Sequence, residues 1–207
     1  MNSRLLRPTD VQHRVSHLAA TMTWHMVHFS ELESLRASLQ FLAFSEAYLE
    51  AAKQLCGALA ACPADSSFPK GAVVMSVTLH GIELFLKAAI LEKAPTEQFS
   101  GNVGHDLERL HKRYANLYPG KKYAFEAPFR TEELVLGDPD PHIIEDLKRR
   151  LAEHKRATPA DQLHRYPRDS AGNLWEGFYS FEASSFAGEI GQVQKDILRL
   201  KDIIFSY

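Results

Sequence analysis

The amino-acid sequence predicts an all-α fold, an up-and-down bundle of four long helices with one or two short ones. Apolar residues recur at helical spacing over several long stretches. No stretch alternates as a β-strand does, and no glycine-rich phosphate loop follows a strand. We expect residues 31–207 to form the helical domain and residues 1–30 to form an N-terminal extension.

The stretch 71–93 is the most apolar part of the chain, and we expect it to be the central helix. Because it is apolar on nearly every side, other helices must cover it on several faces. Its polar side chains Ser76, His80, Glu83 and Lys87 stand at i, i+4, i+7 and i+11, within roughly 60° around the axis. This polar line must be exposed, paired or lining a cleft, because an unpaired buried charge is very costly.

Two elements flank the central helix in the chain. Residues 34–61 carry apolar side chains at helical spacing, and the prolines and glycine of 62–71 end that helix. A short helix with one buried stripe is expected over residues 105–118.

The C-terminal third holds the other two long helices. Residues 118–141 read as a loop or a short helix, and Pro141 then opens a helix over 142–157. The last helix is expected from about residue 178 to 205. Its apolar residues alternate by four and three in a heptad-like seam, formed by Phe186, Ile190, Val193, Ile197, Leu200 and Ile204. Small residues beside them, Gly188 and Gly191 among them, predict a notch where another backbone approaches closely.

Composition narrows the functional classes. The net charge of −2 argues against a general electrostatic attraction to nucleic acid, although local basic patches remain. Cys56 and Cys62 lie about 9 Å apart along a helix, too far for a disulfide. Since no further cysteine–histidine cluster completes a zinc site, we expect no metal and no cofactor. No run of 18 apolar residues occurs, so we expect no membrane span and a cytoplasmic protein.

Three short motifs in this order resemble the HEPN superfamily of helical bundles: LHGIELFLKAAIL, then GHDLERL, then RYP before the last helix. The resemblance covers roughly residues 35–205. It implies an up-and-down bundle that is often a dimer. Members of this superfamily are metal-independent ribonucleases or non-catalytic binding domains, and many act in toxin–antitoxin and anti-phage systems. The matching residues are His80, Glu83, Lys87, Gly104, His105, Asp106, Leu107, Arg165, Tyr166 and Pro167.

The ribonuclease motif of that superfamily is incomplete here. Its Arg-x4-6-His pattern would place the arginine at Arg165, and no histidine lies five to seven residues beyond it. A second string, Arg149 to His154, lies in the preceding helix. Five residues along a helix rotate by about 140°, so these two side chains would diverge.

Each candidate has a structural and a functional interpretation. Glu83 and Lys87 form an ordinary i, i+4 ion pair or face a ligand cleft. Near His105, either Asn102 or Gly104 caps the next helix with Asp106 in its first turn, or His105 completes a polar site.

Two further features carry the same ambiguity. Arg165 clamps a carboxylate such as Glu83, or it binds phosphate. The basic clusters at residues 109–122 and 148–156 form solvated helix faces or an RNA surface, with Tyr114 and Tyr123 available to stack on bases.

The sequence favours a non-catalytic HEPN-like domain that binds a nucleotide, an RNA or a protein partner, and a homodimer through the last helix. The alternatives are a metal-independent ribonuclease and a purely structural module of a larger assembly. In the ribonuclease alternative, either Arg165 or the fallback pair Arg149 and His154 joins His80 or His105 in general acid–base chemistry on a ribose 2′-hydroxyl. The candidate binding residues are His80, Glu83, Lys87, His105, Asp106, Arg165 and Tyr166.

Overall fold

The computed structural model divides the chain into two units, residues 1–34 and 35–207. It describes residues 28–125, 145, 146, 149, 153, 164–169, 171–174 and 181–206. The described part of the first unit holds a single helical turn, α2 (Ser30–Glu33). The expected domain boundary at residue 30 stays a prediction.

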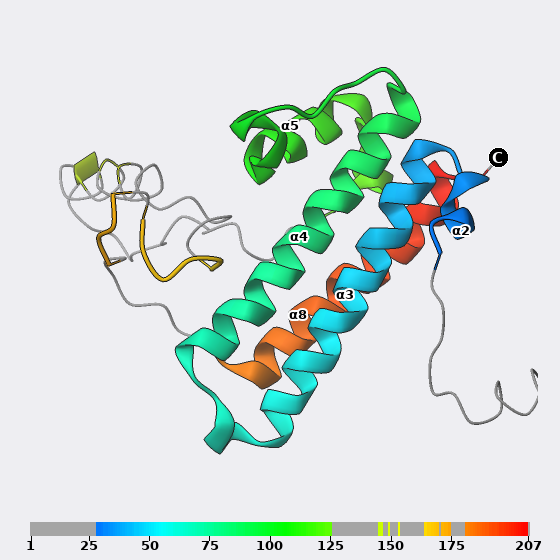
Figure 1. The fold of residues 1–207 in the computed structure, drawn as a ribbon. Coiled ribbons are helices and arrows are strands. Elements are labelled where there is room, and N and C mark those ends of the chain that lie inside the picture. The colour runs from blue at the N-terminus through cyan, green and yellow to red at the C-terminus, as the bar shows by residue number, and fades with distance from the viewer. Residues whose placement is uncertain are drawn as a thin grey trace, which may run out of the picture. The chain divides into compact units, whose positions relative to one another are not determined.

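The second unit is a bundle of helices, which confirms the all-α prediction. Helices α3 (Ala37–Ala61), α4 (Phe68–Lys93) and α8 (Ala183–Ile204) lie side by side, and α5 (Leu107–Leu117) packs on α4 near one end (Figure 1). Short 3-10 turns occur at Pro63–Asp65, Asn102–His105 and Lys121–Tyr123. The described residues contain no strand, and Arg168 and Leu174 form an isolated bridge.

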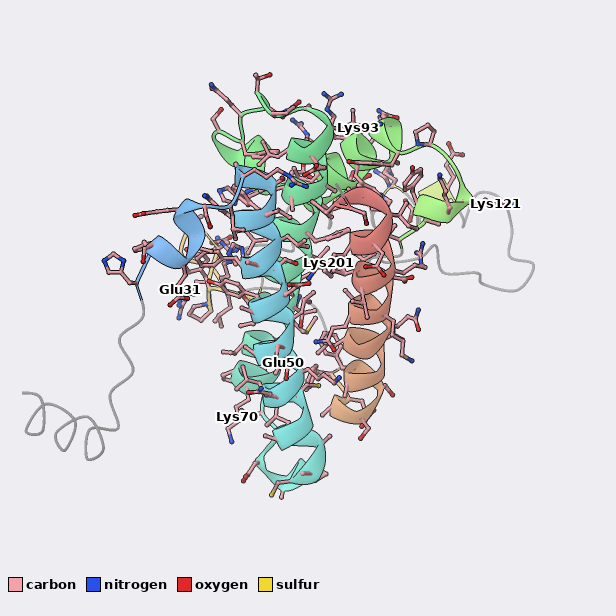
Figure 2. The ribbon with its side chains drawn as sticks, turned by 90° about the vertical axis from the view of Figure 1, so that its right-hand side faces the viewer. Glu31, Glu50, Lys70, Lys93, Lys121 and Lys201 are labelled. Carbon is pink, nitrogen blue, oxygen red and sulfur yellow. The ribbon has the colours of Figure 1, made fainter. Side chains whose placement is uncertain are left out.

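Helix α4 occupies the centre, as its composition predicts. Every residue from Gly81 to Leu91 is buried, including two that carry charges. The helix starts at Phe68, three residues earlier than expected, because Pro69 is compatible with a first helical turn. By length and composition, α4 is the one helix among the described residues that could cross a membrane, and 72% of its most apolar window is buried inside the protein. Figure 2 shows its Lys70 and Lys93 toward opposite ends of the bundle.

Helix α8 contributes the seam that the sequence predicts. Ile190, Val193, Ile197, Leu200 and Ile204 are buried, whereas Phe186 is half-buried and packs against Phe181. The helix begins at Ala183, where Glu182 accepts hydrogen bonds from the backbone N–H groups of residues 184 and 185.

Helices α3 and α4 approach each other closely at Gly81, whereas within the described part of this chain no such contact occurs at Gly188 or Gly191 of α8. A Cβ atom at Gly188 or Gly191 would meet nothing within 4 Å, whereas one at Gly81 would lie 2.8 Å from Leu49 Cγ. The Ser45 hydroxyl donates to the Gly81 carbonyl over 2.7 Å at the same place. Gly81 therefore lets α3 lie directly against the part of α4 that carries the polar line.

The segment after α5 differs in part from the expected loop. Tyr118 and Phe125 are buried in the core, so this end of the segment packs against the bundle. Most of the expected helix 142–157 and the suggested short helix lie outside the described residues, and residues 145, 146, 149 and 153 have helical backbone. Both cysteines are free thiols, as their spacing predicts.

Candidate functional site

The polar line of α4 contains a buried ion pair. Lys87 Nζ donates to Glu83 Oε1 over 2.6 Å, and the two residues are 5% and 2% exposed. The Lys87 ammonium also lies 5.4 Å from the centre of the Phe99 ring. At i and i+4 the pair has ordinary helical spacing. Because it is buried, removing one partner would cost far more folding free energy than breaking an exposed pair.

A histidine from outside the helix completes the contacts of Glu83 Oε1. The 3-10 turn Asn102–His105 brings His105 Nδ1 to 3.0 Å from this oxygen, with the His105 side chain 52% exposed. Gly104 makes the turn possible, because a Cβ atom there would lie 2.9 Å from the Phe99 carbonyl carbon. The functional interpretation of His105, completion of a polar site with the line of α4, therefore has direct geometric support.

The capping interpretation also holds, with a different residue as the cap. Asp106 itself is the N-cap of α5, and its carboxylate accepts from the Arg109 N–H over 3.1 Å. Neither Asn102 nor Gly104 takes that role. The same short segment therefore starts a helix and delivers His105 to Glu83.

The second carboxylate oxygen faces His80. His80 Nδ1 lies 3.6 Å from Glu83 Oε2, and the Tyr48 ring stands edge-on to the imidazole with centroids 4.6 Å apart. Arg165 contacts this histidine, with its Nη2 3.4 Å from His80 Nδ1. The structure shows no contact with Glu83, which one of the two interpretations of Arg165 required. Because a guanidinium only donates, the neutral ring of His80 accepts from Arg165 at Nδ1 and carries its hydrogen on Nε2, whereas the protonated ring presents an Nδ1–H to Glu83.

The Glu83 carboxyl is charged in this environment. Burial alone would raise its pKa, but the hydrogen bonds and charges of His80 and Lys87 outweigh burial and lower the pKa to about 2. The site therefore contains a permanent carboxylate between one ammonium and two imidazoles. Within the part of the chain that the structure describes, Nε2 of His80 and Nε2 of His105 have no hydrogen-bond partner.

Of the remaining sequence candidates, those that the structure describes show no contact with this group of residues. Tyr166 follows Arg165 in the chain and is 59% exposed. Arg149 donates to Asp146 over 2.5 Å, and His154 lies outside the described residues. The cluster is thus His80, Glu83, Lys87, His105 and Arg165, and we call it the Glu83 cluster.

The described residues near α5 fit a solvated helix face, one of the two interpretations of this basic cluster. Tyr114 is buried and its hydroxyl donates to the Tyr123 carbonyl, so it has no free face for a base. Arg109 and Arg113 pair with Asp106 and Glu97, as on a solvated helix face.

Two residues of the cluster's surroundings were missed in the sequence. Tyr48 and Phe99 contact His80 and Lys87, and each looked like an ordinary apolar position. The one sequence signal for Tyr48 was its position in the helix next to Leu49 and three residues after Ser45. In the structure these two residues contact Gly81 of α4, so Tyr48 faces the same part of that helix.

The fold and the cluster define an all-α bundle with a partly exposed ionic site. No family model matches the chain, and neither the curated proteins nor the solved structures contain a match. The resemblance to HEPN domains therefore stays a prediction.

Proposed function

We propose that this protein is a non-catalytic, HEPN-like binding domain that holds a nucleotide or an RNA by a phosphate at the Glu83 cluster. The observation that carries the proposal is one buried carboxylate that is hydrogen-bonded to the His105 imidazole and lies 3.6 Å from the His80 imidazole. Their Nδ1 atoms face Glu83, so their Nε2 atoms remain for a ligand. Arg165 beside His80 adds a guanidinium, the group that matches phosphate geometry best.

Binding without turnover is favoured because the Arg-x4-6-His motif of the ribonuclease members is incomplete in this chain. No histidine follows Arg165 at the required spacing, and Arg149 of the fallback pair is engaged with Asp146. In keeping with the resemblance, the proposal includes a cytoplasmic homodimer in a toxin–antitoxin or phage-defence setting.

A metal-independent ribonuclease is the second candidate, and one contact favours it. A carboxylate that accepts from His105 Nδ1 orients the ring and leaves Nε2 as a general base, here for a ribose 2′-hydroxyl. Under this alternative His80 Nε2–H or Arg165 would act on the phosphate.

Labelled mixed-sequence RNA incubated with the protein in EDTA separates these functions. We expect intact RNA that is retained on a native gel, with retention lost in Arg165→Ala and kept in Arg113→Ala, an exposed arginine that pairs with Glu97. Fragments that disappear in His105→Ala or His154→Ala would instead establish the ribonuclease. If the RNA is neither retained nor cleaved, a protein partner or a structural module remains as the function.

A further inference from the structure

The charges of the Glu83 cluster restrict the kind of phosphate it can hold. Lys87 and Glu83 neutralise each other at 2.6 Å inside the protein. Among the described residues of the cluster, Arg165, which is exposed, is then the permanent positive charge left for a ligand. Among the residues that the structure describes, the Tyr48 ring on α3 also contacts His80, and the Asp106 carboxylate next to His105 in the chain is paired with Arg109.

The two histidines present different atoms to a ligand. His80 carries a hydrogen on Nε2 and donates there, both in the neutral form that accepts from Arg165 at Nδ1 and in the protonated form. His105 Nδ1 donates to Glu83, so its Nε2 offers a lone pair when the ring is neutral and a second donor when it is protonated. The pair can therefore exchange a proton with a bound ligand.

From this arrangement we infer that the group anchored at the Glu83 cluster is a terminal phosphate monoester, bound with uptake of a proton by His80 or His105. This inference rests on the proposed function. A monoester is a dianion above a second pKa of about 6, so Arg165 alone leaves one charge uncompensated and an imidazolium supplies the difference. An internal diester carries a single charge, which Arg165 already matches, and it gives no reason to protonate a histidine.

Titration calorimetry of the whole chain at about pH 7.5 tests the inference, because there a monoester is a dianion and histidine is mostly neutral. The probes are adenosine 5′-monophosphate, ribose 5-phosphate and a dinucleoside monophosphate whose single phosphate is a diester. Repeating each titration in buffers of different ionisation enthalpy gives the number of protons taken up. We expect both monoesters to bind at least about tenfold tighter than the diester, a difference of about 1.4 kcal/mol, with net proton uptake.

Variants identify the histidine that takes up the proton, and a folding measurement excludes any variant that has unfolded. His80→Gln and His105→Gln each remove one titratable ring, and we expect the net proton uptake to fall in at least one of them. His28→Gln, in the other unit of the chain, is the matched control and keeps the uptake. Circular dichroism verifies that each variant is folded.

The outcomes separate the inference from the function on which it rests. Equal affinity for monoester and diester, no proton uptake, or uptake that survives both site variants would overturn the inference and leave RNA binding intact. Failure of every probe together with failure to retain RNA would overturn the proposed function as well.

Discussion

Helix α4 carries two carboxylates with cationic partners, Glu83 near its middle and Glu92 near its end. Glu92 receives two hydrogen bonds from the Arg36 guanidinium, at 2.9 and 3.0 Å, and one from the Ser38 hydroxyl at 2.6 Å. Arg36 also donates to the Phe205 carbonyl over 3.3 Å. This cluster joins the start of α3, the end of α4 and the end of α8.

The two clusters differ in whether the groups that pair with the carboxylate keep a hydrogen-bonding atom for a ligand. Burial raises and the hydrogen bonds lower the pKa of both carboxyls, with a net decrease for each. The arginine fork and the serine hydroxyl at Glu92 are used within the protein, so this cluster is a structural clamp. The two imidazoles at Glu83 each use one nitrogen and present the other, so the same kind of carboxylate here orients groups toward a ligand.

The largest expected difference between the clusters is the cost of breaking a pair. Lys87→Met should lower the free energy of unfolding by roughly 3–5 kcal/mol, because it leaves the Glu83 charge buried without its closest partner. The double variant Glu83→Gln/Lys87→Met should recover a large part of this loss. Urea denaturation followed by circular dichroism measures both, with the exposed Lys112→Met as control. A single variant that costs less than about 1 kcal/mol would show that the pair is solvated.

The pH dependence of stability should distinguish the two carboxylates next. The folded-state pKa of Glu83 is about 2, below its ordinary value of 4.5, so its contribution is present above pH 4.5 and is lost as pH falls toward 2. The contribution is on the order of 3 kcal/mol. The stability difference between wild type and Glu83→Gln should therefore shrink between about pH 5 and 2. Glu92→Gln provides the comparison, and a Glu83→Gln difference that is independent of pH would contradict the assignment.

The smallest expected effect belongs to the clamp. Arg36→Lys should cost up to about 1 kcal/mol, since lysine cannot form the two-pronged hydrogen bond to Glu92. The Arg36 side chain is 42% exposed, so added salt should weaken the wild-type advantage. Unfolding curves at low and high sodium chloride measure this. A loss as large as that of Lys87→Met, unaffected by salt, would remove the distinction between clamp and site.

Helical periodicity explains how much of the fold was predictable. The seam of α8 and the position of α4 followed from the spacing of apolar residues, because burial of such a stripe is a local property of the chain. Periodicity could not predict which surfaces meet. A close approach to α3 occurs at Gly81 of α4, whereas a Cβ atom at Gly188 would meet nothing within 4 Å.

By itself, the sequence determined the all-α class, the central helix and the line that puts His80, Glu83 and Lys87 on one face, since all three depend on the helical repeat. Only the tertiary structure decided that Glu83 and Lys87 are buried as a pair. It also decided that His105 meets Glu83 across 22 residues and that Arg165 meets His80 across 85. Such contacts depend on turns and on packing between distant segments, and no local spacing in the chain encodes them.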